Sequence, residues 1–148
     1  MSTRLYFGYA SNLDQDTLVG RLQHPPKLIG VGVLPHYGFR FSHPNPDGSA
    51  RANILPSPNE NVYGAVYEIT EADVSHFLTS EKDYEFTEVS IAMKEGNSSA
   101  YTFISNQNVS NIFPNQDYYE TILRGGRALQ LPNSYLSSII NRSPNKLY

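Results

Sequence analysis

A series of short β-like runs limits the folds that this chain can adopt. Each run is apolar or alternates between apolar and polar residues, and turn-forming residues such as Gly, Pro and Asn lie between most of them. Runs of this kind predict strands, and residues 94–97 between the last two runs predict a hairpin turn. The predicted strands are Leu5–Tyr9, Lys27–Leu34, Tyr37–Ser42, Ala52–Leu55, Val62–Ile69, Phe86–Met93 and Ala100–Ile104.

Predicted helices are fewer and are spaced irregularly among the strands. They are Asp14–Leu22, one that begins at Thr70, one that follows Pro114 and one that begins at Asn133. The third contains a Gly-Gly pair at 125–126, and each Gly lowers helix stability by about 1 kcal/mol relative to Ala, so this pair predicts close backbone packing or a helix end. Many strands and scattered helices predict an α+β domain, a small mixed β-barrel of about six or seven strands flanked by helices.

Composition restricts the class of protein further. A length of 148 residues is typical of one domain, so we expect a single domain over residues 1–148. No apolar run approaches the roughly 20 residues that span a bilayer, and no signal-peptide pattern follows Met1, so we expect a cytoplasmic protein with no membrane partner. The net charge is −3 and the basic residues are scattered, which argues against a nucleic-acid partner. The sequence does not determine the oligomeric state.

A glutamate continues an apolar stripe on the second predicted helix. Val74, Phe77 and Leu78 have the i, i+3, i+4 spacing of a stripe that faces the core, and Glu81 occupies the next position on it. A carboxylate that points toward the interior suits a general acid or base. Alternatively, the helix ends at residue 79 or 80 and Glu81 lies in a solvated loop, because glutamate is rarely buried without a partner. The spacing nominates Glu81 as a catalytic candidate and goes no further.

The segment that joins the first strand to the first helix contains aromatic residues followed by small ones. Its sequence is Tyr6-Phe7-Gly8-Tyr9-Ala10-Ser11-Asn12-Leu13. Successive accessible N–H groups at a strand-to-helix junction form a natural site for an anion, such as a substrate carboxylate or a developing oxyanion. An ordinary turn, with Asn12 or Asp14 as the N-cap of the helix, explains the same residues equally well.

Other chemistries have less support in the sequence. There is no cysteine, which excludes disulfides and thiolate catalysis. Ser11 lies outside any G-x-S-x-G elbow, and no histidine is visibly paired with it. Neither of the glycine-rich nucleotide-binding fingerprints occurs. The histidines at 24, 36, 43 and 76 lack metal-ligand spacing, so we expect no metal.

Several segments, taken together, match one known family in order and in spacing. They are residues 6–13, Ala52–Ile54, Val62–Ile69, Pro114–Tyr118 and Leu123–Pro132. Over nearly the whole chain they resemble the γ-glutamylcyclotransferase family, which opens with Y-F-x-Y-G-S-N-L and closes with a helix followed by L-P. The resemblance implies a small mixed β-barrel with helices packed around it.

The resemblance also implies a reaction. In this family a glutamate after the second helix is catalytic, and that position falls on Glu81. The implied enzyme, a cofactor-free acyltransferase or amide-cleaving lyase, lets the α-amino group of a γ-glutamyl amino acid or amine attack its own γ-carbonyl. The products are 5-oxoproline and a free amine, and the expected partner is this small-molecule γ-glutamyl substrate. Because the nucleophile belongs to the substrate, no cofactor or metal is expected. The implied substrate-binding residues are Tyr6, Phe7, Gly8, Tyr9, Ala10, Ser11 and Tyr118.

The chain departs from the family pattern at glycine positions. Gly8 and Ala10 stand where the family usually has Ala and then Gly. If φ at the second position were positive, Ala10 would cost roughly 1–2 kcal/mol. Gln130 stands where glycine is common before Leu-Pro.

The segment after Glu81 leaves the substrate and the activity open. Lys82 stands where the family tends to have Gly, and the family's pocket tyrosine corresponds to Tyr84 or to Phe86. One alternative keeps the reaction and changes the released amine, for example in a γ-glutamyl-protected metabolite or an isopeptide. The other is a catalytically weak or inactive γ-glutamyl-binding, stress-associated module of the same fold. The intact glutamate favours an enzyme.

Overall fold

Over residues 2–143, the part of the chain that the computed structural model describes, five strands form a closed barrel. The strands are β1 (Thr3–Gly8), β2 (Lys27–Pro44), β3 (Ala50–Thr70), β4 (Glu85–Met93) and β5 (Gly96–Ile104). Their order around the barrel is β1-β3-β2-β4-β5. All neighbouring pairs are antiparallel except β1 and β5, which close the barrel through a parallel contact between Tyr6 and Tyr101. The sheet is therefore mixed, as predicted.

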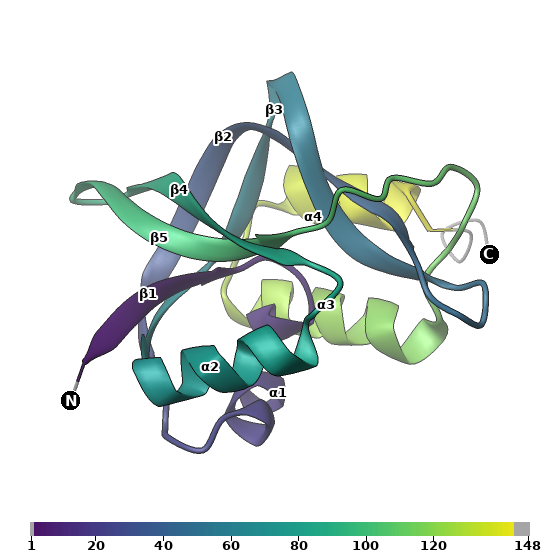
Figure 1. Cartoon of the computed structure of the whole chain (residues 1–148). Helices are drawn as coiled ribbons and strands as arrows, with labels where there is room; N and C mark the ends of the chain where they lie inside the picture. The colour runs from purple at the N-terminus through teal and green to yellow at the C-terminus, as the bar shows by residue number, and fades with distance from the viewer. Residues whose placement is uncertain (1, 144–148) are drawn as a thin grey trace.

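The helices pack at one end and along one side of this barrel. They are the short 3-10 helix η1 (Ser11–Leu13) and the α-helices α1 (Gln15–Arg21), α2 (Glu71–Ser80), α3 (Gln116–Ala128) and α4 (Asn133–Asn141). Figure 1 shows α1, α2 and α3 gathered below the barrel, whereas α4 lies higher, beside β3. Among the described residues, no helix combines the length and the apolar character needed to cross a membrane. The arrangement confirms the predicted α+β fold class.

The number of strands differs from the prediction of about six or seven. Each of the two longest strands, β2 and β3, joins two strands that the sequence predicts separately. The predicted breaks fall at Pro35-His36 and at residues 56–61, which are rich in Pro and Asn. In the structure these residues form a bulge, where the pairing shifts register between Pro35 and Tyr37 and His36 has a φ of 66°. A bulge bends a strand without ending its pairing, so the count is five.

One hydrophobic core fills the barrel and continues under the helices. Phe7, Ile54, Val66 and Ile91 are fully buried in it. Burial of each such side chain contributes about 1.5–3 kcal/mol. Gly64 lets β3 lie close to β1, because a Cβ there would be 2.6 Å from the Gly8 carbonyl oxygen. Buried side chains fill the barrel interior.

Helix α2 begins at a polar cap and ends one residue before Glu81. The Thr70 hydroxyl oxygen accepts a hydrogen bond from the Asp73 N–H at 3.2 Å, so the helix begins where the sequence predicts. The last helical residue is Ser80, and Glu81 is the C-cap. The helix therefore ends before Glu81, as the alternative interpretation of the sequence expects.

The apolar stripe of α2 is narrower than predicted. Val74 and Phe77 are buried, and the Phe77 ring lies 5.2 Å from the Tyr6 ring of β1. Leu78 is 49% exposed, so the prediction that it faces the core is wrong. The helix has only a short stretch in contact with the barrel, and Leu78, one position further round than Phe77, turns away from it.

Helix α3 supports the segment that follows β1. The Asn115 side chain caps α3 by accepting a hydrogen bond from the Tyr118 N–H at 3.0 Å. Gly125 packs directly on the chain below it, because a Cβ there would lie 2.3 Å from the Asp14 nitrogen and 2.4 Å from the Leu13 carbonyl carbon. The predicted reason for a glycine in the middle of this helix, close backbone packing, is confirmed. Helix α3 continues through the glycine pair and does not end there.

Candidate active site

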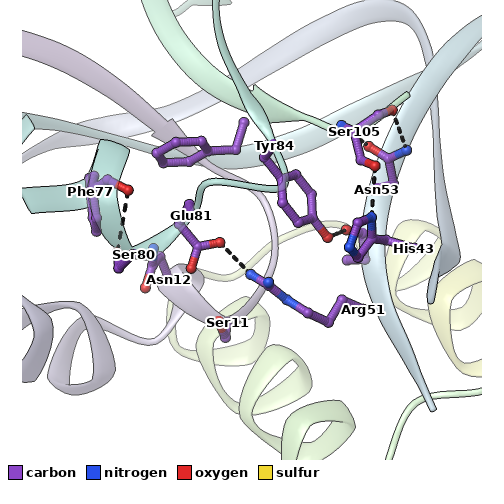
Figure 2. Close-up of polar contacts among 12 residues, drawn as sticks. Ser11, Asn12, His43, Arg51, Asn53, Phe77, Ser80, Glu81, Tyr84 and Ser105 are labelled. Carbon is purple, nitrogen blue, oxygen red and sulfur yellow. Dashed lines mark hydrogen bonds and ion pairs between the residues drawn. The ribbon is translucent and has the colours of Figure 1, made fainter. Parts of the chain in front are cut away.

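Glu81 lies at the edge of a cavity at the helical end of the barrel (Figure 2). A turn fixes its backbone: the Glu81 N–H donates to the Phe77 carbonyl at 2.8 Å, and the Glu81 carbonyl accepts from the Tyr84 N–H at 2.9 Å. The side chain is only 23% exposed, and its Oε2 accepts a hydrogen bond from Arg51 Nη2. Although Glu81 follows the helix end, its carboxylate contacts a cation in a cavity and does not lie in a solvated loop.

Arg51 is the cation that faces Glu81. It lies near the start of β3, and its guanidinium stacks over the Tyr84 ring, 4.7 Å from the ring centre. Burial opposes the positive charge of Arg51, but Tyr84 and Glu81 more than offset this effect, so the pKa of Arg51 lies above its ordinary value. Arg51 is therefore a permanent cation beside the carboxylate.

Two tyrosine hydroxyls at the site accept hydrogen bonds and keep their own protons. The Tyr6 hydroxyl accepts from Asn12 Nδ2 at 2.8 Å, and the Tyr118 hydroxyl accepts from the Ala52 N–H at 2.9 Å. Burial raises the pKa of both phenols, so both are neutral near pH 7. Within residues 2–143 neither hydroxyl donates to a protein acceptor, so each can donate to a ligand.

Two further tyrosines are fixed as walls of the cavity. The Tyr9 hydroxyl donates to the Phe103 carbonyl at 2.7 Å, and the Tyr84 hydroxyl donates to the Ala52 carbonyl at 2.7 Å. Of the two candidates after Glu81, Tyr84 lines the cavity, and Phe86 stacks in the β4–β5 aromatic cluster instead.

The segment between β1 and α1 is held by an arginine from α1. Arg21 Nη1 donates to the Ser11 hydroxyl at 3.0 Å and to Asn12 Oδ1 at 2.6 Å. Asp14, one of the two predicted N-caps, caps α1. Ala10 has a φ of −124°, so it escapes the penalty expected for a left-handed conformation. Among the described residues, the N–H groups of Ala10, Ser11 and Asn12 have no protein acceptor and remain available.

Two adjoining cavities surround Glu81. The inner one has a volume of about 40 Å³, and the outer one has about 440 Å³. The tyrosines described above line the inner cavity, whereas Asn45, His76 and Asn115 line only the outer one. The residues that line both are Ser11, Arg21, Arg51, Glu81 and Tyr118.

Most of the residues nominated from the sequence lie together around the inner cavity. They are Tyr6, Tyr9, Ala10, Ser11, Glu81 and Tyr118. Phe7 and Gly8 do not line it: the Phe7 side chain is fully buried in the barrel core, and Gly8 packs against the Asn12 side chain. Strand alternation accounts for Phe7, because neighbours on β1 face opposite sides. Gly8 lies on the same face as Tyr6, but the Asn12 side chain covers it. Lys82, the departure after Glu81, is exposed and lines neither cavity.

Three polar residues of the cavity lining were not nominated from the sequence: Arg21, Arg51 and Asn12. Asn12 belongs to the segment already singled out, but it was interpreted as a possible N-cap of the first helix. In the structure its side chain instead donates to the Tyr6 hydroxyl. Arg21 and Arg51 are isolated basic residues, a type that normally lies in solvent. Only the packing of α1 and β3 around Glu81 gives them a role.

The chemistry available here is acid/base catalysis and the binding of charged organic groups. The site has one carboxylate, two guanidinium groups, neutral phenols and backbone N–H groups. Within the described part of the chain, no three His, Asp or Glu side chains converge so as to hold a metal ion.

Fold and site together define a class of small five-stranded barrels with a carboxylate at the helical end. The chain belongs to the AIG2-like family, whose model matches residues 61–139. The matched segment begins within β3, includes Glu81 and Tyr118, and ends in α4.

Curated relatives and solved structures resemble this chain over most of its length. The chain is 25% identical to a γ-glutamylcyclotransferase of Bos taurus over 95% of this chain and 79% of the relative. It is similar in structure to an uncharacterised protein of Homo sapiens, with a TM-score of 0.86 and 22% identity over 100% of this chain and 92% of the other. A structure named γ-glutamyl cyclotransferase matches with a TM-score of 0.79 and 23% identity over 93% of this chain and 86% of the other. At these identities, the two structures show that the fold is shared.

Proposed function

We propose that the protein is a γ-glutamylcyclotransferase, which converts a γ-glutamyl amino acid or amine to 5-oxoproline and the free amine. The observation that carries the proposal is the position of Glu81, whose carboxylate faces a cavity lined by unpaired N–H groups and neutral phenols. The γ-glutamylcyclotransferase name of the 25% identical relative of Bos taurus supports it.

In the proposed reaction Glu81 moves protons between two nitrogen atoms of the substrate. It accepts a proton from the α-ammonium group, and the freed lone pair attacks the γ-carbonyl carbon. As the bond from that carbon to the leaving nitrogen breaks, Glu81 delivers the proton to the leaving nitrogen. A second proton follows the same route, so Glu81 ends as a carboxylate and charge is conserved. A well-placed acid/base group contributes about 10²–10⁴-fold in rate.

The surrounding donors have complementary roles in this proposal. The available N–H groups of residues 10–12 bind the α-carboxylate of the glutamyl head. The hydroxyls of Tyr6 and Tyr118 each have a proton to donate, and one of them stabilises the negative charge that develops on the γ-carbonyl oxygen. Removal of one such donor typically costs about 3–4 kcal/mol at the transition state.

The test is the rate of 5-oxoproline formation from a γ-glutamyl dipeptide by the Glu81→Gln variant. We expect a loss of about 10²–10⁴-fold with the fold retained, because the amide keeps the shape of the side chain and cannot accept a proton. Glu71→Gln is the matched control, since Glu71 also pairs with an arginine but lines neither cavity. Full turnover by Glu81→Gln would exclude the proposed mechanism.

A second candidate is a γ-glutamyl-binding module with little or no activity. One observation favours it: in this structure Arg51 donates a hydrogen bond to the Glu81 carboxylate, which the mechanism uses as the base. Calorimetry that detects binding of a γ-glutamyl compound, together with no 5-oxoproline under the same conditions, would select this candidate.

A further inference from the structure

The ion pair between Arg51 and Glu81 competes with the α-ammonium group of a substrate for the same carboxylate. The inner cavity, with about 40 Å³, is much smaller than the outer one, with about 440 Å³. The pair occupies one oxygen of the carboxylate that, in the proposed reaction, binds the α-ammonium group (Figure 2). When the α-ammonium group replaces the guanidinium, Arg51 loses its anionic partner.

The charges around the cavities indicate what the displaced Arg51 would bind. The permanently charged side chains that line the two cavities are Arg21, Arg51 and Glu81, which gives two positive charges and one negative charge. A γ-glutamyl amino acid has the opposite set, with one ammonium and two carboxylates. A γ-glutamyl derivative of a neutral amine lacks the second carboxylate and leaves one guanidinium without a partner. The charges of the site are therefore complementary to a substrate whose leaving group carries a carboxylate.

We propose that Arg51 is a specificity-determining residue, which leaves Glu81 when substrate enters and binds the carboxylate of the departing amino acid or peptide. This proposal rests on the proposed function and narrows its substrate class. The favoured substrates carry a carboxylate on the carbon next to the departing nitrogen, and γ-glutamyl derivatives of uncharged amines are poor substrates.

The geometry assigns this task to Arg51 and leaves Arg21 to the glutamyl head. Arg21 is held by two hydrogen bonds to Ser11 and Asn12, in the segment with the available N–H groups. The α-carboxylate of the head is bonded to the same carbon as the α-ammonium, so it lies on that side of Glu81. Both arginines line both cavities, but Arg51 has one side-chain hydrogen bond, to the Glu81 carboxylate that would bind the α-ammonium group, so Arg51 is the one that the substrate releases.

Stacking on Tyr84 allows Arg51 to change partner without becoming disordered. The guanidinium lies over the ring at 4.7 Å, and the ring is fixed by the bond from its hydroxyl to the Ala52 carbonyl. A guanidinium can slide on an aromatic face while it keeps most of the cation–π attraction. Tyr84 thus keeps the guanidinium at the junction of the two cavities.

The test compares γ-glutamylalanine with γ-glutamylalaninamide, which differ only in the charge of the leaving group. We expect the wild-type protein to prefer the carboxylate in kcat/KM by about 10- to 100-fold, the usual worth of a charge-assisted hydrogen bond. In Arg51→Gln the ratio should fall to near one, and in Arg51→Lys it should lie between these values. Arg4→Gln is the matched control, because Arg4 also pairs with a glutamate and stacks on a tyrosine at 4.7 Å, but away from the site. That variant should keep the wild-type ratio.

Two kinetic results would overturn the proposal. One is a wild-type ratio near one. The other is an equal loss for both compounds in Arg51→Gln, which would make Arg51 a positioning residue for Glu81. If Arg51→Gln does not fold, the same criterion applies to Arg51→Lys.

Titration calorimetry with the same two compounds separates this proposal from the proposed function. If γ-glutamylalanine binds more tightly to wild type than to Arg51→Gln but no 5-oxoproline forms, the role of Arg51 is supported and the reaction is excluded. Turnover without any preference would keep the reaction and exclude the role of Arg51. Absence of both binding and turnover would exclude both.

Discussion

Replacement of Gly125 by Ala tests how α3 supports the substrate segment. A Cβ at this position would lie 2.3 Å from the Asp14 nitrogen and 2.4 Å from the Leu13 carbonyl carbon. Both are backbone atoms that cannot rotate away, so α3 and the segment below it must separate. Gly20 in α1 offers the opposite case, because nothing lies within 4 Å of the Cβ that would be added there.

The expected magnitude is the difference between a packing loss and a helix gain. Overpacking against fixed atoms costs about 3 kcal/mol, the upper end of the usual range. Ala gains back about 1 kcal/mol over Gly inside a helix. Gly125→Ala should therefore lower the free energy of unfolding by about 2 kcal/mol, or Tm by roughly 4–8 °C for a domain of this size. Gly20→Ala should raise the free energy of unfolding by up to about 1 kcal/mol.

Urea unfolding followed by circular dichroism measures both variants. The midpoint of Gly125→Ala should fall and that of Gly20→Ala should rise or stay, with the slope of each transition unchanged. If Gly125→Ala is as stable as wild type, the close approach of α3 to Asp14 does not limit this position, and the reasoning is refuted.

Three further predictions concern stability. Gln130 has a φ of 59° just after α3, a conformation that favours Gly. Gln130→Gly should therefore raise the free energy of unfolding in urea by about 0.5–1 kcal/mol, whereas Gln130→Ala should leave it unchanged. Hydrogen bonds from Arg40 hold the pKa of Glu60 at about 2, below its ordinary 4.5, so Glu60 stabilises the fold above pH 4.5 and this stability is lost as pH falls toward 2. Because Glu60 is partly exposed, we expect the loss to be about 1–2 kcal/mol between pH 5 and pH 2, and to be absent from Glu60→Gln; an equal loss in that variant would contradict this assignment. Tyr118→Phe leaves the Ala52 N–H without a partner and should cost about 1–3 kcal/mol in thermal unfolding; an unchanged Tm would show that water replaces the hydroxyl.

Features that depend on neighbours in the sequence were predictable. Strand alternation identified the strand-forming segments, and local signals at Thr70 and Pro114 identified the starts of α2 and α3. Two failures also have local causes. A bulge at His36 resembles a turn in the sequence because both interrupt an apolar run. Leu78 fits the spacing of the apolar stripe, but it points away from the short part of α2 that contacts the barrel.

The candidate site was predictable only where it follows a local pattern. Glu81 and the segment from Tyr6 to Ser11 follow helix spacing and a family motif. Arg51 has no such pattern, because it meets Glu81 across 30 residues through the packing of β3 and α2. The same limit applies to the environment of Glu81. Periodicity suggested an apolar surrounding for the carboxylate, whereas the structure surrounds it with an arginine and tyrosines.

The central claim is that the substrate's own α-amino group is the nucleophile, and product analysis in ¹⁸O-labelled water tests it most directly. Wild-type protein and γ-glutamylalanine should give 5-oxoproline and alanine in equal amounts, with no ¹⁸O in either product, because no water enters the reaction. Free glutamate with one ¹⁸O atom in its γ-carboxyl group would show attack by water and would contradict the account.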